Sequence, residues 1–210
     1  MNPQIRFGED LMSRVSFAMM NSNGAHEMTK AIRVAINNLL DELVGKVNVS
    51  KDNILELSLV ANPVMHHIFL GIDPSELGGA PFSLAVDSAV STSAKTFGID
   101  INDGGKIYVL PCIAGHVGAD TSGVVLSEKP FESEQITLLV DIGTNAEIVL
   151  GNNERLLACS SPTGPAFEGA QISCGQRATA GAIERVEIDP ISLKSRFKVI
   201  GSDYWSNDEK

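Results

Sequence analysis

The segment at residues 137–150 constrains the fold of this 210-residue chain more than any other part of the sequence. Two runs rich in aliphatic and β-branched residues flank Asp141-Ile142-Gly143-Thr144-Asn145, which predicts a strand, a tight turn and a second strand. A carboxylate at the end of a buried strand, as expected for Asp141, is costly unless water, a donor or a metal ion satisfies it. The turn therefore predicts either an anion-binding nest beside a water-held Mg²⁺ or an ordinary hairpin with Asp and Asn as turn formers.

Composition excludes several classes of protein. The net charge of −10 argues against a nucleic-acid binder, which needs clustered Lys and Arg. Cys112, Cys159 and Cys174 are odd in number and widely spaced, which fits neither a disulfide framework nor a zinc or iron–sulfur site. No apolar run approaches the roughly 20 residues that span a bilayer. We expect a soluble, cytoplasmic α/β protein with no membrane and no nucleic-acid partner.

The pattern of apolar residues predicts the elements along the chain. Helical spacing predicts helices over 7–20 and 26–47. Asn62-Pro63 predicts the start of a short helix that runs through Leu70, and a threonine cap with an early proline predicts one over 163–174. Further helices are expected over 84–97 and in the small-residue segment 117–125. Alternation and β-branched runs predict strands over 54–60, 106–110, 137–142, 145–151 and 155–160. The polar, proline-containing stretch 128–134 predicts a boundary between two lobes. His66 and His67 are adjacent on a helix, about 100° apart, and are expected to pack rather than to share a metal ion.

The succession of three strands, a polar turn and a helix differs from the common nucleotide-binding motifs. In the Rossmann unit the glycine loop joins a strand to a helix, whereas here it joins two strands. The G-x-x-x-x-G-K-[ST] motif of the P-loop is absent from the sequence.

Asp141-Ile-Gly-Thr-Asn145 resembles a phosphate loop of the actin-like ATPase superfamily, in which one such hairpin in each of two lobes holds ATP between them. More narrowly, the chain resembles the ATPase part of the reductive activators of corrinoid proteins. The matching segments are Asn2-Pro-Gln4, Phe7-Gly-Glu-Asp-Leu-Met-Ser-Arg14, Met65-His66, Leu70-Gly71, Pro81-Phe82, Leu110-Pro-Cys-Ile-Ala114, Val117-Gly-Ala-Asp-Thr121, Asp141–Asn145, Gly164-Pro-Ala-Phe-Glu-Gly-Ala170 and Gly181-Ala-Ile-Glu184.

Some parts of the family pattern are absent or altered. The sequence lacks a first Asp-Ile-Gly-Thr-Thr hairpin, an amino-terminal [2Fe–2S] domain and a late glycine-rich adenosine loop. Ala61-Asn-Pro-Val-Met65 and Ser160-Ser-Pro-Thr-Gly164 depart from the usual Gly-Asn-Thr-Thr-Met and Ser-Thr-Ala-Ala-Gly. We therefore expect an internal fragment of a longer protein with an actin-like (ribonuclease H-like) fold, each lobe a mixed sheet with flanking helices. Residues 1–134 would be the remainder of the first lobe and 135–210 the start of the second.

The resemblance implies roles for particular residues. Asp141 would hold Mg²⁺ through water, and Asp120 would orient the attacking water. The other cofactor-binding residues would be Gly143, Thr144, Asn145, Gly164 and Glu168. The alternative is that these residues have structural roles only. Residues 141–145 would then form an ordinary turn, and Asp120 and Glu168 would complement helix dipoles. Glu147 would either point into the cleft or face solvent.

The implied function is ATP-dependent reduction of a Co(II) corrinoid to Co(I) on a methyl-carrier protein, with ATP and Mg²⁺ as cofactors and the [2Fe–2S] cluster in the missing domain. Two alternatives stay open. One is a fragment that is inactive or serves only in interactions. The other is a small-molecule kinase of the same superfamily. Separately, exposed edges of a truncated sheet would favour association, and a homodimer is the expected form.

Overall fold

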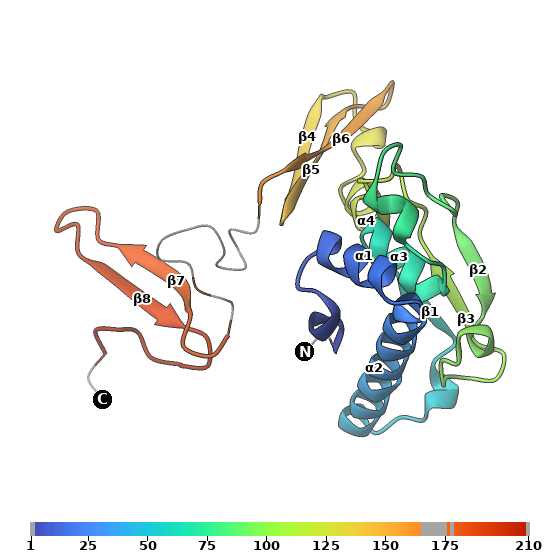
Figure 1. Cartoon of the computed structure of the whole chain (residues 1–210). Coiled ribbons are helices and arrows are strands. Elements are labelled where there is room, and N and C mark those ends of the chain that lie inside the picture. The colour runs from blue at the N-terminus through green and yellow to red at the C-terminus, as the bar shows by residue number, and fades with distance from the viewer. Residues whose placement is uncertain (1–2, 165–175, 177–178, 209–210) are drawn as a thin grey trace. The chain divides into compact units, whose positions relative to one another are not determined.

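The computed structural model describes residues 3–164, 176 and 179–208, and helix α2 (Gly24–Val47) is its longest element (Figure 1). It ends at Asn48, whose left-handed backbone donates its N–H to the Val44 carbonyl. Helix α1 (Leu11–Met20) begins after Asp10, whose side chain accepts a hydrogen bond from Ser13 N at 2.7 Å. Both helices confirm predictions from apolar spacing.

The predicted helix over 7–20 began too early. Pro3–Phe7 forms a separate 3-10 helix, η1, and the chain breaks at Gly8 before α1. Gly8 has φ +153°, and a Cβ there would lie 2.7 Å from the backbone nitrogen of Arg14. Only glycine fits this close approach, so the helix starts again at the Asp10 cap.

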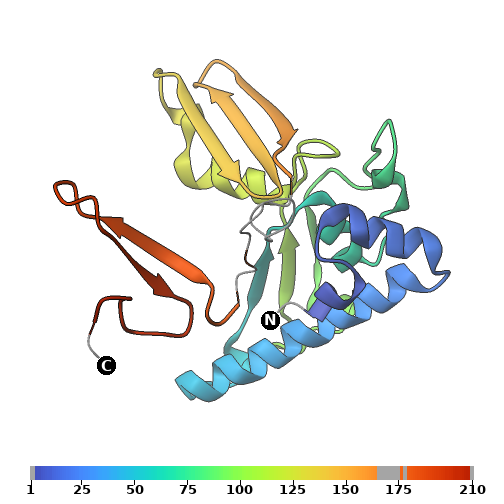
Figure 2. The same ribbon diagram turned by 60° about the vertical axis from the view of Figure 1, so that its left-hand side comes forward.

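The first sheet has the order β1-β3-β2, made of β1 (Glu56–Leu59), β3 (Lys106–Val109) and β2 (Val90–Ser93). β1 is parallel to β3, with Leu57 opposite Ile107, and β2 is antiparallel to β3, so the sheet is mixed as predicted. Helices α1, α2 and α3 (Pro63–Leu70) pack together beside it (Figures 1 and 2). α3 begins as expected, with Asn62 accepting from Met65 N and proline in its first turn.

The prediction of a helix over 84–97 was wrong. Residues 84–89 form no helix, Val90–Ser93 is strand β2, and Ala94–Phe97 is the 3-10 helix η4. Valine, serine and threonine have low helix propensity, and β3 offers this stretch a ladder of backbone partners. Short 3-10 helices also occur at Lys51–Asn53 (η2), Ser75–Gly78 (η3) and Pro130–Glu132 (η5).

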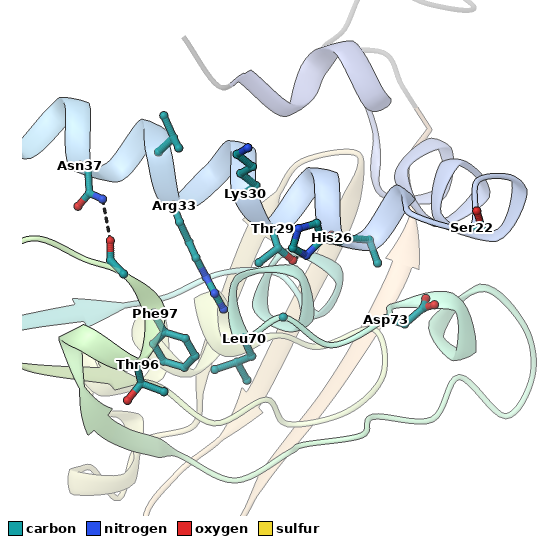
Figure 3. A pocket seen from close by; sticks show the side chains of 14 residues that line it. Ser22, His26, Thr29, Lys30, Arg33, Asn37, Leu70, Asp73, Thr96 and Phe97 are labelled. Atoms are coloured by element: carbon teal, nitrogen blue, oxygen red, sulfur yellow. Dashed lines mark hydrogen bonds between the residues drawn. The ribbon is translucent and has the colours of Figure 1, made fainter.

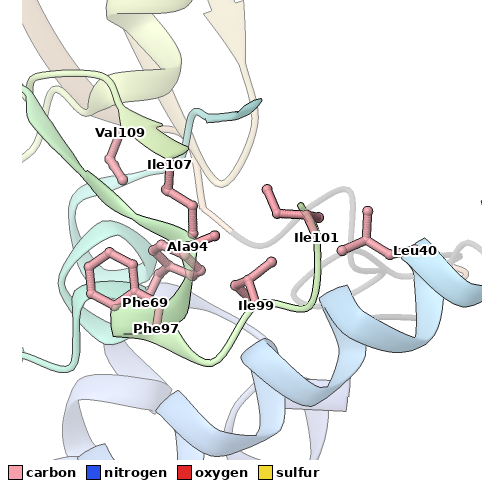
Figure 4. Packing of buried hydrophobic residues seen from close by; sticks show 8 residues of the cluster. All are labelled: Leu40, Phe69, Ala94, Phe97, Ile99, Ile101, Ile107 and Val109. Carbon is pink, nitrogen blue, oxygen red and sulfur yellow. The ribbon is translucent and has the colours of Figure 1, made fainter. Parts of the chain in front are cut away.

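Two apolar clusters stabilise this part of the chain. One lies between α2, α3 and the sheet and comprises Leu40, Phe69, Ala94, Phe97, Ile99, Ile101, Ile107 and Val109 (Figure 4). The other joins α1, α2 and α3 and comprises Phe7, Val15, Ala18, Met28, Val64, Ile68 and Leu77.

His66 and His67 of α3 are buried, with ring centroids 5.4 Å apart. His67 is satisfied: Nδ1 lies 2.9 Å from the Pro63 carbonyl, and Nε2 accepts from Ala85 N at 3.0 Å. Neither ring nitrogen of His66 has a hydrogen-bond partner of good geometry in the described residues. Burial, with a smaller effect of His67, lowers the pKa of His66 to about 4. Both histidines therefore pack as neutral rings.

The buried His66 predicts a loss of stability in acid. An unfolded histidine has a pKa near 6.5, so between about pH 6.5 and pH 4 the unfolded chain binds one more proton than the folded chain. The free energy of unfolding should therefore fall as the pH falls through this range, by about 2–3 kcal/mol from His66. In His66→Leu this part of the pH dependence should disappear in urea denaturation between pH 7.5 and pH 5. An unchanged pH slope in the variant would contradict the assignment.

A second three-stranded sheet has the order β4-β5-β6, from β4 (Thr137–Ile142), β5 (Asn145–Gly151) and β6 (Leu156–Pro162). Helix α4 (Ala119–Glu128) precedes it. All four elements confirm predictions. A further pair, β7 (Ile183–Ile188) and β8 (Ser195–Val199), is antiparallel and was not predicted.

The chain divides into two compact units. The first runs to Asp141 and includes Glu147–Ser161, and the second comprises Ile142–Ala146 and the chain from Pro162 onward. The predicted lobe boundary at 134/135 stays a prediction. Within the described residues, no helix is long and apolar enough to cross a membrane.

Candidate functional site

The turn between β4 and β5 is held by hydrogen bonds within its own unit. Gly143 N–H donates to the Asn145 carbonyl at 2.8 Å. The Thr163 hydroxyl lies 2.6 Å from the Gly143 carbonyl and 2.9 Å from the Thr144 carbonyl, and the N–H groups of Thr163 and Gly164 both donate to Thr144 O at 3.1 Å. The N–H groups of Gly143 and Gly164 therefore fix the turn in this structure and are not directed at a ligand.

Thr163 is a site residue that sequence reasoning missed. The sequence predicts it as the cap of a helix over 163–174, but its hydroxyl contacts two carbonyls of the turn 19 and 20 residues earlier. Most of that helix, including Glu168, lies outside the described residues. No local signal in the sequence distinguishes a cap from such a long-range contact.

Asp120 lies in the first turn of α4 and is held tightly by its surroundings. Its backbone N–H donates to the Ala61 carbonyl at 3.2 Å, and its carboxylate accepts from Thr121 N at 2.9 Å. A Cβ at Gly118 would lie 2.5 Å from the Asp120 carboxylate and 2.8 Å from the Ala61 carbonyl, so glycine is required there. The small residues predicted to allow close approach thus position Asp120 beside the start of α3.

Three carboxylates in the first unit interact electrostatically. Burial, and then the charge of Asp141, raise the pKa of Asp120. Burial also raises the pKa of Glu147, with smaller contributions from Asp120 and Asp141. The structure therefore brings together two predicted residues, Asp120 and Asp141, and adds Glu147, whose orientation the sequence left open. Burial is the larger cause of both shifts, and a nearby cation would offset the part that comes from like charges.

Asp141 differs from expectation in one respect. The sequence predicts it at the end of a buried strand, but Asp141 is exposed and Ile142 beside it is 63% exposed. Side chains alternate along a strand, so Asp141 shares the face of Thr137 and Leu139, which is less exposed than the face of Leu138 and Val140. Its cost of desolvation is correspondingly small.

The carboxylates fit a magnesium ion held through water. In the described residues no three Asp, Glu, His or Cys side chains converge closely enough to chelate a metal directly. Mg²⁺ keeps several of its waters and takes oxygen ligands from one or two carboxylates and from substrate phosphates. Asp141, and Asp120 and Glu147, whose pKa values its charge helps to raise, offer oxygen donors of this kind.

Ser160 supports Glu147. Its hydroxyl donates to the Glu147 carboxylate at 3.1 Å from the neighbouring strand β6, which partly offsets the rise in the pKa of Glu147. In Ser160→Ala the pKa of Glu147 should rise further, because the ionised form loses a donor. Side-chain carboxyl NMR titration would measure it, with Ser161→Ala as the matched control on the same strand. An unchanged or lower pKa in Ser160→Ala would contradict the role of this bond.

The second sheet with its phosphate-type hairpin is typical of the actin-like (ASKHA) nucleotide-binding proteins, and comparison with known proteins agrees. The model of the RACo middle region matches residues 1–130, and that of the C-terminal domain of RACo, the ASKHA domain, matches residues 135–206. The chain therefore belongs to the RACo family, the reductive activators of corrinoid proteins. The family resemblance and the α/β actin-like fold class inferred from the motifs are confirmed.

Similar proteins carry names from the same chemistry. A corrinoid activation enzyme, RamQ, of Eubacterium limosum is 33% identical over 96% of this chain and 33% of its own length. A reductase of the Co(II) methylated-amine-specific corrinoid protein of Methanosarcina barkeri is 27% identical over 84% of this chain and 33% of its own length. A solved reductive activator for corrinoid, iron–sulfur protein aligns with a TM-score of 0.82 and 38% identity, over 95% of this chain and 32% of that one. The chain thus spans about a third of the relatives' length.

Proposed function

We propose that ATP binding or hydrolysis by this chain drives a conformational change that helps to reduce a Co(II) corrinoid to Co(I) on a methyl-carrier protein. The observation that carries the proposal is the Asp141–Asn145 hairpin with carboxylates Asp120 and Glu147 electrostatically coupled to Asp141. The names of its relatives, which refer to corrinoid activation and to reduction of a Co(II) corrinoid protein, support reduction as the reaction.

In this proposal the residues of the hairpin have different roles in binding ATP. Thr144 and Asn145 contact phosphate oxygens, while Gly143 and Gly164 shape the turn around the Thr163 hydroxyl. Bound Mg²⁺ neutralises phosphate charge. Asp141 would hold that ion through water, and Asp120 would position the water that attacks the terminal phosphate. Thr144 and Asn145 lie three and four residues after Asp141 in the same turn, which suits the role of a phosphate loop.

The electron balance of the corrinoid step is simple. One electron from a low-potential iron–sulfur donor converts Co(II) to Co(I), which can then accept a methyl group. ATP favours the scarce Co(I) state only if it binds the competent conformation more tightly, and a hundredfold difference would contribute about 2.7 kcal/mol. The iron–sulfur donor and the corrinoid carrier remain partners proposed from the family.

Mg-ATP binding is the first test. Calorimetry on the 210-residue chain should give saturable binding that requires Mg²⁺. A folded chain, as judged by circular dichroism, that binds no ATP would contradict the nucleotide part of the proposal.

Corrinoid reduction is the second test. The chain, a Co(II) corrinoid carrier and titanium(III) citrate would be mixed without oxygen, and Co(I) followed by its absorption. Mg-ATP should increase the yield of Co(I). ATP binding without any increase would contradict the activation step alone. Phosphoryl transfer to an added small-molecule acceptor would instead support a kinase.

A further inference from the structure

A cavity of about 830 Å³ lies in the first unit, and its lining includes neither the hairpin residues nor Asp120, Asp141 or Glu147 (Figure 3). One wall is helix α2, and the others are the turn after α3 at Leu70–Gly71, Asp73 and the end of η4 at Thr96–Gly98. This volume is within the range of small-molecule sites.

The α2 wall of the cavity is basic in a chain that is acidic overall. His26, Lys30 and Arg33 are spaced four and three residues apart, so they project from one side of the helix in successive turns. The neighbouring acidic residue Glu27 does not line the cavity. In a chain of net charge −10, Lys30 and Arg33 make this wall of the cavity locally cationic.

Among the residues that the structure describes, no carboxylate pairs with Arg33. Its Nε and Nη2 donate to the Phe69 carbonyl at 3.1 and 2.7 Å, and its guanidinium lies 4.8 Å from the Phe97 ring centroid. None of the acidic groups that the structure describes comes within 4.0 Å of it, and burial lowers its pKa. A half-buried cation without a counter-charge costs free energy, which a bound anion would offset.

Asp73, the carboxylate that lines the cavity, accepts hydrogen bonds from Ser75. Asp73 Oδ1 accepts from the backbone N–H and the hydroxyl of Ser75, at 2.9 and 2.6 Å. Figure 3 shows Asp73 near Ser22, well separated from Arg33 and Lys30. The basic end of the cavity is thus free of negative charge from the cavity wall.

We propose that this cavity binds a small oxyanion, a phosphate or carboxylate, that carries an apolar group. Arg33 is held in place by the Phe69 carbonyl and the Phe97 ring, and it would receive the anion together with Lys30. Val34, Leu70 and the edge of Phe97 line the same space and suit the apolar part. No residue of the proposed nucleotide site lines this cavity, so the inference goes beyond the proposed function.

Phenyl phosphate is a suitable probe, since it combines a dianion with an apolar ring. NMR titration of the full chain should show saturable shifts for α2 and Gly71, which weaken as salt is raised. Benzoate separates carboxylate from phosphate, inorganic phosphate tests the need for the ring, and benzyl alcohol tests the need for charge. Benzyl alcohol binding as well as phenyl phosphate would overturn the proposal.

Variants on one helix locate the site. Lys30→Glu should weaken phenyl phosphate binding at least about tenfold, and Arg33→Met should do the same if its circular dichroism matches the parent. Lys46→Glu makes the same charge change on α2 outside the cavity and should retain binding. Equal affinity in Lys30→Glu and the parent, or equal loss in Lys46→Glu, would overturn the proposal. Lys30→Glu should leave Mg-ATP affinity unchanged. The anion proposal and the Mg-ATP proposal can therefore be rejected independently of one another.

Discussion

Replacing Asp141 with alanine is expected to weaken Mg-ATP binding by about a hundredfold or more, on the order of 2.7 kcal/mol. Asp141 is the carboxylate next to the hairpin turn, and its charge acts on both Asp120 and Glu147. Asp141→Asn keeps the shape but removes the charge, and it should be nearly as severe. Calorimetry with Mg-ATP measures both variants.

Two comparisons make this test specific to a water-held ion. Asp103→Ala removes the same charge from a side chain that is 94% exposed, and it should retain parental affinity. In EDTA the parent and Asp141→Ala should bind ATP equally weakly, because the difference between them depends on Mg²⁺. A loss that persists in full without Mg²⁺ would show that Asp141 acts by shaping the turn instead.

Ile107→Ala is expected to lower the free energy of unfolding by about 2–5 kcal/mol. Ile107 is fully buried on the central strand β3, opposite Leu57 of β1 and Thr92 of β2, and it packs in the cluster with Phe69, Phe97 and Val109 (Figure 4). Truncation leaves a cavity that the sheet cannot close. Urea denaturation followed by far-UV circular dichroism, dominated by the helices of this unit, measures the loss.

The size of the effect should follow burial and volume. Ile107→Val removes one methylene and should cost about 0.5–1.5 kcal/mol. Ile191→Ala makes the larger change at a side chain that is 92% exposed, and it should change stability by less than about 0.5 kcal/mol. Similar losses in Ile107→Ala and Ile191→Ala would contradict the central role of this cluster.

Local patterns determined much of the secondary structure. The periodicity of α2, the Asn62–Pro63 start of α3 and the alternating strands 137–142 and 145–151 each specify their element within a few neighbouring residues. The pentapeptide at 141–145 likewise predicted the hairpin, and the ordered set of matching segments along the chain identified the family. These features were predictable because capping, helical spacing and turn chemistry act over short distances.

Other features depended on contacts distant in sequence. The sequence predicts a helix over 84–97, but β3 provides β2 with a pairing partner in the structure. Arg33 is fixed by the carbonyl of Phe69, 36 residues away, and Thr163 by carbonyls at 143 and 144. The same is true of Glu147, whose contact with Ser160 crosses from β5 to β6.

The sequence by itself determined the family and the helices and strands of the hairpin region. It also predicts Asp120 and Asp141 as acidic site residues, and these roles stay predictions. Only the tertiary structure decided which carboxylates interact, which N–H groups of the turn are already occupied, and where an unneutralised cation faces a cavity. The physical reason is that charge interaction and desolvation depend on distance and burial in space, which chain position does not fix.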